Sequence, residues 1–387
     1  MKRLAIITTH PIQYYAPFFK MLAASEGLRI KVFYTLGKQE ATFDRGFGRQ
    51  ISWDVPLLEG YDHAFLKNTA QNPGSHHFQG ITNPDLVKEI NQWKADAVLV
   101  FGWCYVSHLN ALRHYKGKIP VYFRGDSHLL DEQSGFRRNL RRLALKWVYH
   151  HIDYAFYVGT ANKRYFLEHG LKEEQLIFAP HAIDNQRFAD PDGQYARQAE
   201  EWRLQLRILK HQVVVLFAGK FEAKKNPLLL LQAAQHFRKS DRFSFVFAGN
   251  GPLEEQLKEE ARGMANVHFM NFQNQSRMPA LYRLGDIFVL PSQGPGETWG
   301  LAVNEAMACS CPVLVSDKVG CAADLVMNSR NGFVFSHNNL TDLTEKIRLL
   351  STDIISMGAE SYKIVQDWCF EKQSSAFTGL INAHVNA

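Results

Sequence analysis

The sequence predicts an α/β protein made of two doubly wound parallel-sheet domains in tandem. Short apolar runs recur along the 387 residues, and helical patterns lie between them. Most runs are rich in Val, Ile, Leu and Phe without polar alternation, as in strands buried on both faces of a parallel sheet. The stretch Asp190-Pro-Asp-Gly193 is typical of a turn and separates two series of alternating strands and helices. We therefore expect domains at 1–187 and 194–365.

Each domain is expected to hold six strands. Those of the first domain are predicted at 4–9, 30–35, 97–101, 121–124, 154–158 and 176–179. Those of the second domain are predicted at 213–218, 243–248, 267–271, 287–291, 313–316 and 332–335, with helices that include 227–237, 253–262 and 301–309. Open α/β sheets bind ligands at the carboxyl ends of their strands. The loops that follow these strands are therefore the candidates for a functional site.

The composition is that of an ordinary globular protein. Apolar residues make up 46% and charged residues 21%, which excludes disordered, collagen-like and coiled-coil chains. The best apolar run, 97–106, falls well short of the roughly 18 residues that a transmembrane helix needs. Residues 1–10 are charged and then briefly apolar, which indicates a first strand rather than a secretory signal. The five cysteines are odd in number and lack metal-finger spacing, so we expect reduced thiols in a cytosolic protein.

The excess of positive charge lies in one half of the chain. Residues 1–190 hold 24 Lys and Arg against 18 Asp and Glu, whereas 191–387 hold 20 of each. This asymmetry predicts that the two domains have different partners, one of them acidic. It falls short of a nucleic-acid-binding signature, which requires a more basic domain and a recognisable module. No nucleic-acid partner is expected.

Part of that charge lies on a predicted amphipathic helix over 136–149. Leu140, Leu143, Trp147 and Val148 recur there at helical spacing, and four arginines and a lysine surround them. Such a helix can lie on anionic lipid. A solvated helix with its apolar face in the core produces the same pattern, and we favour that interpretation over membrane contact.

The stretch from Pro291 to Ala308 carries the strongest chemical signal. It follows a predicted strand, passes through a glycine-rich loop and opens a helix at about Gly300. The N-terminus of a helix presents unpaired N–H groups and a partial positive charge, which suit a phosphate. Glu297 and Glu305 flank this point, and a carboxylate can accept from two vicinal hydroxyls of a sugar or a ribose. The alternative is that the glycines are ordinary turns and both glutamates are solvated.

The two glutamates, with seven residues between them, resemble the signature of the family-4 retaining glycosyltransferases, also described as glycosyl transferases group 1. Ala306-Met-Ala and Pro312-Val extend the resemblance. It implies the GT-B fold, in which two Rossmann-like doubly wound parallel-sheet domains face a cleft. It also implies that the first domain binds the acceptor and the second a nucleotide-sugar donor. A C-terminal helix over about 366–387 is expected to pack back on the first domain.

The resemblance covers roughly 211–340 and implies which residues bind the donor diphosphate and base. Lys220 and Lys225 match the basic positions that grip the diphosphate, and two ammonium groups facing a diphosphate are sound chemistry in themselves. The alternative is that Lys225 only starts a solvated helix. Gly249 matches the turn after the next strand, and Phe272 matches the loop against which the nucleobase lies.

Within the glutamate motif, the resemblance implies that Glu297 holds hydroxyls of the donor sugar and that Glu305 holds the ribose. Trp299, Gly300 and Leu301 complete the predicted donor contacts. Together with the two lysines, the N–H groups near Gly300 are expected to stabilise the departing nucleoside diphosphate, the electrostatic effect that usually dominates such catalysis.

The first domain resembles the family less closely. The family's Gly-Gly loop after the first strand is replaced by Thr9-His-Pro-Ile-Gln-Tyr-Tyr15, where Gln13 or His10 is the expected hydrogen-bond donor. The alternative is that His10 caps a strand and the two tyrosines belong to the core. We retain Gln13 as a predicted substrate-binding residue.

The family's His-Asp pair at the end of the fourth strand corresponds to Phe123-Arg-Gly-Asp-Ser-His128. This stretch lacks the histidine but keeps Asp126, which we predict to be catalytic, with capping of the next turn as the alternative. His128 replaces the histidine only if the loop turns it inward. Arg124 is a candidate contact for a phosphate or an acidic acceptor.

We therefore predict an enzyme, a retaining hexosyltransferase-type glycosyltransferase of bacterial surface polysaccharide or glycolipid synthesis. Glu297, Asp126 and Lys225 are its predicted catalytic residues. The donor is a UDP- or GDP-linked sugar, the acceptor is a glycan or a lipid-linked molecule, and no cofactor or metal is expected. We expect it in the cytoplasm, with peripheral contact to an anionic membrane left open. The rival hypotheses are a GT-B-like phosphorylase or epimerase, and a catalytically degenerate GT-B partner subunit.

Overall fold

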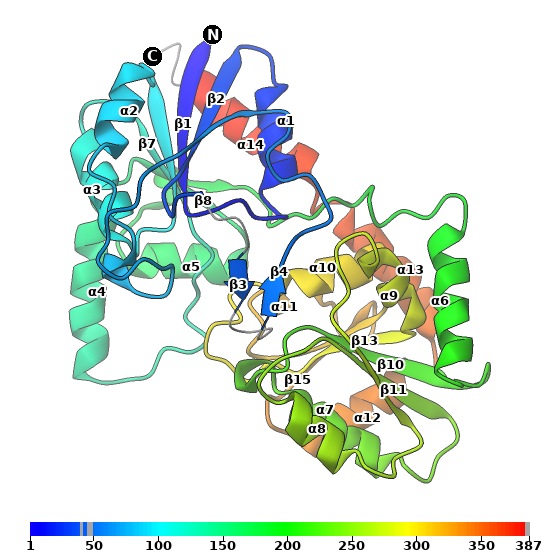
Figure 1. Cartoon of the computed structure of the whole chain (residues 1–387). Coiled ribbons are helices and arrows are strands. Elements are labelled where there is room, and N and C mark those ends of the chain that lie inside the picture. The colour runs from blue at the N-terminus through cyan, green and yellow to red at the C-terminus, as the bar shows by residue number, and fades with distance from the viewer. Residues whose placement is uncertain (39–41, 45–48, 384–387) are drawn as a thin grey trace. The chain divides into compact units, whose positions relative to one another are not determined.

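The computed structural model of the protein describes residues 1–38, 42–44 and 49–383. The chain divides into two compact units, each built on its own parallel sheet (Figure 1). Unit 1 contains Pro56–His181 with the described residues of 1–40 and 370–387. Unit 2 contains Ala182–Cys369 with the described residues of 41–55.

This division differs from the predicted boundaries at two places. The sequence analysis assigns 182–187 to the first domain, but these residues belong to unit 2. The buried Phe188 anchors them there, because Arg283 of the same unit donates to its carbonyl at 2.6 Å. The described residues of 41–55 also belong to unit 2, although the chain before and after them belongs to unit 1. Residues 384–387 of the predicted C-terminal helix lie outside the described residues.

Unit 1 holds a seven-stranded parallel sheet in the order β5-β2-β1-β6-β7-β8-β9. Its strands are β1 (Lys2–Thr8), β2 (Leu28–Tyr34), β5 (Asp62–Phe65), β6 (Ala97–Phe101), β7 (Val121–Arg124), β8 (Tyr154–Tyr157) and β9 (Leu176–Phe178). Six of them confirm the predicted runs to within two residues at either end. The sequence analysis misses β5, because this short edge strand is only half-buried and carries two polar residues in four.

Helices cover both faces of this sheet. On one face lie α2 (Leu86–Gln92), α3 (Val106–Tyr115), α4 (Phe136–Tyr149) and α5 (Thr160–Glu168), whose apolar residues form one core with alternate residues of the strands. On the other face α1 (Ala16–Ala23) packs against α14 (Phe370–Ala383), the last helix of the chain (Figure 1). Phe377 of α14 stacks on Phe156 of β8 with ring centroids 3.6 Å apart. The two ends of the chain therefore complete the same layer.

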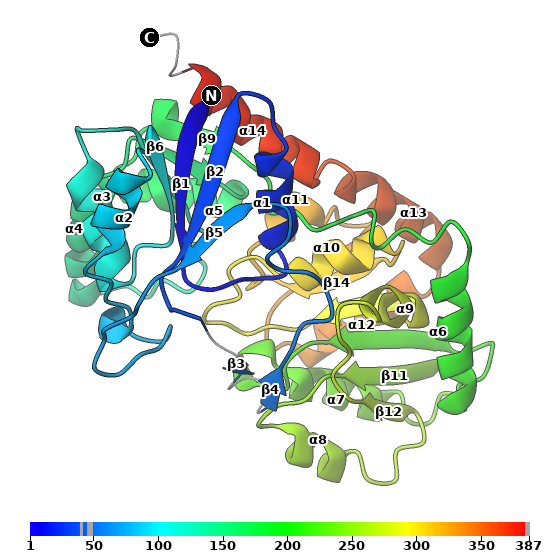
Figure 2. The same cartoon turned by 45° about the horizontal axis from the view of Figure 1, so that its top comes forward.

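Unit 2 holds a six-stranded parallel sheet in the order β12-β11-β10-β13-β14-β15. Its strands are β10 (Val213–Ala218), β11 (Phe243–Ala248), β12 (Val267–Met270), β13 (Ile287–Leu290), β14 (Val313–Ser316) and β15 (Gly332–Phe335), all within one residue of the prediction. Figure 2 shows β11 and β12 side by side. A short antiparallel pair, β3 (Thr42–Asp44) and β4 (Arg49–Ile51), belongs to the same unit and has no counterpart in the prediction.

The helices of unit 2 also form two layers. A core of alternate strand residues packs against α7 (Pro227–His236), α8 (Glu254–Glu260) and α12 (Leu340–Leu350). The remaining helices are α6 (Gln194–Gln205), α9 (Met278–Leu284), α10 (Leu301–Ala308), α11 (Ala322–Leu325) and α13 (Ile354–Val365). Among them α6 packs on α9, α9 on α10, and α10 on α13. Short 3₁₀ turns lie at Phe78–Gly80, Glu173–Gln175 and Ala223–Lys225.

A repeated device holds the amino ends of the strands. Three aspartates each stand immediately before a strand, and each accepts from the first or second backbone N–H of a neighbouring strand: Asp96, Asp153 and Asp286. Asp286 accepts from Val214 N–H and from Arg203, both at 2.7 Å. These carboxylates bind N–H groups that no ladder partner reaches.

The basic helix α4 does not have the orientation that we favour from the sequence. Leu140, Leu143 and Trp147 are 51%, 66% and 49% exposed, and Phe136 is 75% exposed. The core is contacted by Leu145, Val148 and Tyr149 instead. The prediction that the apolar stripe faces the core is therefore wrong for all of its residues except Val148. No helix within the described ranges is both long and apolar enough to cross a membrane.

The aspartate before β13 gives a test of the fold. Asp286→Ala removes a charged acceptor from two donors, so the free energy of unfolding is expected to fall by about 1.5–3 kcal/mol. Urea denaturation followed by circular dichroism measures the change. Asp241→Ala is the matched control, because the Asp241 side chain is 92% exposed. Equal stability of the two variants would contradict the role given to Asp286.

Candidate active site

The strand order of unit 2 points to one edge of its sheet. From β10 the chain proceeds to β11 and β12 on one side, and from β13 it proceeds to β14 and β15 on the other. In doubly wound sheets, ligands bind outside the carboxyl ends of the strands where the order reverses in this way. The loops after β10 and β13 therefore form the candidate site, and they carry the predicted residues Lys220, Lys225, Glu297 and Gly300.

Hydrogen bonds join these two loops. Gln293 donates from its backbone N–H to the carbonyl of Lys224 at 2.9 Å and from its side chain to the carbonyl of Ala223 at 2.8 Å. Asn226 then adopts a left-handed conformation with φ of 51°, and Pro227 begins α7 directly after it. The loop after β10 thus turns sharply while its backbone is held by the loop after β13. Lys220, in the same loop, is partly exposed.

Lys225 and Glu297 form an ion pair across the two loops. The ammonium of Lys225 contacts Oε2 of Glu297, and Ser292 donates to the same oxygen at 2.9 Å. The side chain of Glu297 is 7% exposed and that of Lys225 is 18% exposed. The structure therefore brings together two of the predicted catalytic residues, which lie more than seventy residues apart in the chain.

The environment keeps Glu297 charged. Burial opposes the charge, but the positive charge of Lys225 and the hydrogen bonds from Lys225 and Ser292 outweigh burial and hold the pKa of Glu297 below its usual value. The charge of Lys224 acts in the same direction. The site therefore presents a negative carboxylate and a positive ammonium in contact.

Gly300 shapes the start of α10. Its φ is +95°, and a Cβ there would lie 2.9 Å from a methyl carbon of Val319, so both the conformation and the contact require glycine. Backbone N–H groups of Gly320 and Cys321 donate to the carbonyls of Glu297 and Trp299, which fixes the loop just before the helix. Leu301 is the first residue of α10. The helix N-terminus therefore follows directly on the Lys225–Glu297 pair.

Trp299 contributes to the site by packing. Its indole is 3% exposed, donates to Asn304 at 2.9 Å and lies 5.0 Å from the ring of Trp368, measured between centroids. Any contact of Trp299 with a donor therefore falls to its backbone, and the indole instead braces the loop against the rest of unit 2.

Glu305 lies one turn into α10 and is 2% exposed. Tyr282 of α9 donates to its Oε2 at 2.6 Å, and Arg187 lies 3.9 Å from its Oε1. The carboxylate is thus oriented by a phenol and faces a guanidinium. Its assignment to the ribose stays a prediction.

The loops after β11 and β12 continue the row of strand ends. Gly249, after β11, has φ of +150°, and a Cβ there would come within 1.9 Å of the carbonyl oxygen of Gly219. The loops after β10 and β11 can therefore lie this close only because residue 249 has no side chain. The next residue, Asn250, accepts from the backbone N–H of Phe272, after β12, at 2.8 Å. Phe272 is half-buried.

In unit 1 the predicted residues lie at the carboxyl ends of β1 and β7. Gln13 stands in the turn between β1 and α1, and Asp126 stands two residues beyond β7. Burial, together with the charge of Asp126, raises the pKa of Tyr15. His181 stacks against Tyr15, and burial and the charge of Arg124 lower its pKa.

Arg124 serves the fold. Its side chain is buried and donates to the carbonyls of Ala179 and Pro180 at 3.0 and 3.1 Å. Its guanidinium is thus directed at the segment that follows β9, which is a structural role that the sequence analysis does not foresee. His10 contacts Thr9, and His128 accepts from the backbone N–H of Leu130, so both histidines make local contacts.

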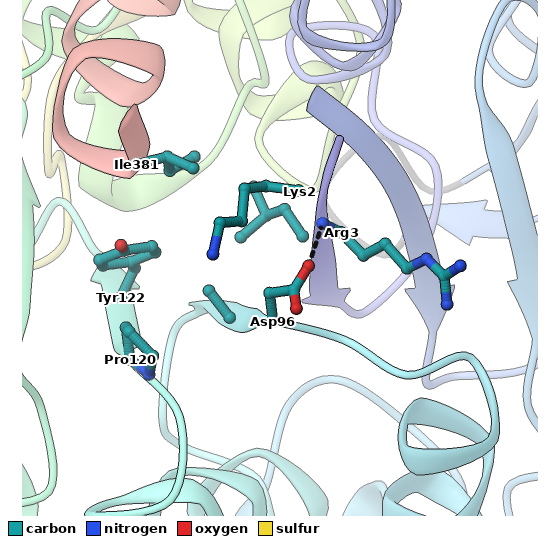
Figure 3. A pocket seen from close by; sticks show the side chains of 8 residues that line it. Lys2, Arg3, Asp96, Pro120, Tyr122 and Ile381 are labelled. Carbon is teal, nitrogen blue, oxygen red and sulfur yellow. Dashed lines mark hydrogen bonds between the residues drawn. The ribbon is translucent and has the colours of Figure 1, made fainter. Parts of the chain in front are cut away.

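A small hollow at the opposite end of the unit 1 sheet is unrelated to these residues. Figure 3 shows Lys2, Arg3 and Asp96 on one side of it and Pro120 and Tyr122 on the other. It measures about 30 Å³, room for one or two waters. It lies at the amino ends of the strands, where the backbone N–H of Arg3 donates to Asp96 at 2.8 Å. Within the described ranges, no group of three or more His, Cys, Asp or Glu residues is arranged to hold a metal ion.

Comparison with a family model matches most of the second unit. Residues 198–360 match the model of the family described as glycosyl transferases group 1. This region of unit 2 is therefore similar to glycosyl transferases group 1. The match spans the loops of Lys220, Lys225 and Glu297. The predicted resemblance to group 1 is confirmed for this part of the chain, and the retaining family-4 subclass stays a prediction.

Curated relatives match part of the chain. The putative glycosyltransferase EpsF of Bacillus subtilis is 31% identical over 163 residues, which are 41% of this chain and 40% of that protein. A D-inositol 3-phosphate glycosyltransferase of Geodermatophilus obscurus is 28% identical over 227 residues, 54% of this chain and 48% of the relative. The chain thus spans about half or less of the length of these two relatives.

Solved structures resemble the whole chain. A sucrose-phosphate synthase from Thermosynechococcus elongatus has a TM-score of 0.74 with 15% identity and covers 100% of both chains. Anabaena Alr3699/HepE in complex with UDP has a TM-score of 0.73 with 17% identity and covers 99% of this chain and 100% of its own. At these identities the likeness is one of fold. It confirms the predicted fold class, GT-B, with two Rossmann-like doubly wound domains.

The residues that support Glu297 and Glu305 are not among those predicted from the sequence. Ser292 directly follows the predicted strand and precedes Glu297 by five residues. The sequence therefore places it at the site but does not indicate that it donates to Glu297. Tyr282 and Arg187 come from α9 and from the segment before α6. No local pattern relates them to Glu305, because the contact depends on how these segments pack.

The lowered pKa of Glu297 predicts how its contribution to stability depends on pH. A glutamate in an unfolded chain titrates near about 4.3. Because the folded pKa is lower, the stabilisation is complete above the unfolded pKa and is lost as the pH falls through the folded pKa. Glu297→Gln should therefore lower the melting temperature equally at pH 7 and pH 5.5, and the difference from wild type should shrink below about pH 4.

Thermal unfolding across this pH range checks the expectation. Glu345→Gln, on the exposed face of α12, is the matched control and should track wild type throughout. A difference that grows as the pH falls would contradict the charged state given to Glu297.

Proposed function

We propose that the protein is a retaining glycosyltransferase that transfers a hexose from a nucleotide sugar. One observation carries the proposal: the buried Lys225–Glu297 pair lies at the reversal point of the unit 2 sheet, directly before the N-terminus of α10. A cation and a helix N-terminus suit a diphosphate, and a carboxylate suits sugar hydroxyls. The family match of residues 198–360 supports the same reading.

The residues of unit 2 would act on the leaving group. An ammonium has three donors, so Lys225 can contact the diphosphate while it keeps its bond to Glu297. Lys220, from the same loop, and the first N–H groups of α10 add positive potential where negative charge develops on the departing diphosphate. Glu297, held by Lys225 and Ser292, would orient the hydroxyls of the donor sugar.

The chemistry needs no carboxylate nucleophile, because a diphosphate is already a good leaving group. The bond from the sugar carbon to the diphosphate breaks, the acceptor oxygen bonds to that carbon on the same face, and the acceptor proton passes to a diphosphate oxygen. Asp126 of unit 1 is proposed to contact substrate. No divalent cation is assigned a role, since lysines and a helix N-terminus supply the positive charge.

The donor and acceptor classes are proposed from chemistry and from relatives. Anabaena Alr3699/HepE binds UDP and UDP-glucose, which supports a UDP-linked donor, with GDP as the alternative. A transferase of Campylobacter jejuni, 27% identical over 230 residues that are 57% of each chain, acts on a diphospho-undecaprenol lipid by its name. We propose a glycan or lipid-linked acceptor in surface polysaccharide or glycolipid synthesis. The five cysteines are free thiols, which agrees with a cytoplasmic location.

Product analysis after a binding screen tests the proposal. A ligand that binds only the native state raises the melting temperature, so a panel of nucleotide sugars identifies the donor by thermal shift. The chosen donor is then incubated with acceptors, with and without a chelator. The proposal is supported by a glycoside that keeps the anomeric configuration of the donor and forms in equal amounts with and without the chelator. A sugar phosphate or an epimerised nucleotide sugar would instead show the phosphorylase or epimerase, and binding without turnover would show the degenerate subunit.

Glu305 provides a prediction for the donor site. Glu305→Gln should weaken the affinity for the free nucleoside diphosphate by roughly tenfold or more, because a hydrogen bond to a charged group contributes about 1.5–3 kcal/mol. Isothermal titration calorimetry measures the affinity. Tyr282→Phe is the control for orientation, since it removes only the phenol that donates to Glu305, and it should cause a smaller loss. Unchanged affinity in Glu305→Gln would remove Glu305 from the ribose.

The exposed stripe of α4 extends the proposal to a membrane. Phe136, Leu140, Leu143 and Trp147 follow one another at spacings of four, three and four residues, so they share one exposed face. By helical periodicity, Arg137 lies on one side of this face and Lys146 on the other, and both are exposed. An apolar face with basic flanks fits the surface of an anionic bilayer. Arg142 is not part of it, because it pairs with Glu132 and Glu168.

Vesicle binding tests this contact. Leu140→Ser with Leu143→Ser should reduce co-sedimentation with vesicles of phosphatidylglycerol and phosphatidylcholine at every salt concentration. Arg137→Gln with Lys146→Gln should reduce it mainly at low salt, since each basic residue near the surface contributes on the order of 1 kcal/mol. Leu204→Ser, on α6, is the matched control because Leu204 is 72% exposed. If the wild-type protein does not co-sediment with anionic vesicles at low salt, the membrane contact is wrong and the acceptor is soluble.

A further inference from the structure

A segment of the chain from between two unit 1 strands lies on the loop after β12. We call Ser52–Val55 the strap; it belongs to unit 2, whereas β2 before it and β5 after it belong to unit 1. The side chain of Asn274 donates to the carbonyl of Ser52 at 2.7 Å. Ser276 donates to the carboxylate of Asp54 from its backbone N–H at 3.1 Å and from its hydroxyl. The strap is therefore held on both sides of Trp53.

Trp53 lies between these two anchors. Its ring centroid is 6.1 Å from that of Phe272, and the rings meet edge to face at 63°. Both aromatic side chains are only half-buried. Aromatic residues of a finished core are normally covered on both faces, so this pair leaves apolar surface at the carboxyl end of β12.

That surface continues the row of loops that forms the candidate site. Asn250, next to Gly249, fixes the backbone N–H of Phe272. Neighbouring strands lie about 4.8 Å apart, so the end of β12 is about 10 Å from the end of β10, where Lys225 follows. If the diphosphate of a nucleotide lies at the loops of β10 and β13, its nucleobase therefore reaches Phe272 and Trp53.

A second observation concerns Gln275, which stands between the two residues that hold the strap. Its side chain is 4% exposed, and its carbonyl oxygen has no hydrogen-bond partner among the described residues. A buried acceptor without a partner is destabilising. Such a group is expected where a ligand brings a donor, and the ring N–H of uracil or guanine is a donor of this kind.

We propose that Trp53 is an aromatic wall of the subsite for the donor's nucleobase and that Gln275 supplies a hydrogen-bond acceptor to the base. The proposal rests on the proposed function, because it assumes a nucleotide sugar as the ligand of unit 2. The base subsite then draws on residues outside the matched family region of 198–360, since the strap precedes it by more than a hundred residues.

Binding of a nucleoside diphosphate and of inorganic pyrophosphate separates the base from the phosphates. Trp53→Ala should weaken the affinity for UDP or GDP by roughly tenfold to a hundredfold, the effect of losing one base–aromatic stack, and leave pyrophosphate within twofold. Trp53→Phe should retain most of the affinity. The change in tryptophan fluorescence on nucleotide binding should become smaller, because the contribution of Trp53 is lost. Tyr362→Ala, an exposed aromatic residue of α13, is the matched control.

Gln275→Leu distinguishes a ligand contact from a structural one. Removal of a partnerless acceptor should leave the melting temperature of the ligand-free protein unchanged or higher, while the shift caused by the nucleotide becomes smaller. A lower melting temperature without ligand, with an undiminished nucleotide shift, would overturn the role of Gln275.

The outcomes also separate this proposal from the proposed function. If wild type binds nucleoside diphosphate and a folded Trp53→Ala binds it equally well, the base subsite is wrong and the donor site stands. If wild type binds neither nucleoside diphosphate nor pyrophosphate, the proposed function and the subsite are both wrong.

Discussion

The arrangement of unit 2 depends on one buried ion pair at the carboxyl ends of two central strands of its sheet. Lys225 and Glu297 come from loops that the sheet brings together only because β10 and β13 are neighbours. Removal of either partner would leave a buried charge without compensation, which is far more costly than the pair itself is stabilising. The two loops are therefore constrained to one relative position. Close by, a side chain at Gly249 would clash with Gly219 in the loop after β10, and one at Gly300 would clash with Val319.

The same pair fixes the orientation of the site's carboxylate in the ligand-free protein. The carboxylate of Glu297 is held in its charged form by Lys225 and Ser292, so its orientation exists before any ligand arrives. Preorganised charges of this kind need no rearrangement when the charge of a leaving group develops. Trp299 contributes by bracing the loop against Trp368, which makes it a support for the site rather than a surface of it.

Most strands could be predicted from the sequence, because buried parallel strands leave continuous apolar runs. The loop of Glu297 could be predicted as well, because its glycines directly follow such a run, whereas its contact with Lys225 was not predicted. The misses have physical reasons. The edge strand β5 is half-buried and has no apolar run to detect. The stripe of α4 has the same spacing whether it faces a core or solvent, and only the packing of Leu145 and Val148 decides between them. The partners of Glu305 depend on contacts between segments that no local pattern connects.

The last helix of the chain sets the order in which the molecule can be completed. Phe377 of α14 stacks on Phe156 in the sheet of unit 1, and α14 packs beside α1. During synthesis the strands of unit 1 leave the ribosome before those of unit 2, yet the part of the sheet that α14 covers stays exposed until Phe370–Ala383 follow. Unit 2, whose residues are contiguous apart from the segment 41–55, can close earlier. Unit 1 is thus completed only after unit 2 has been translated, and the surface around Phe156 is exposed in the meantime.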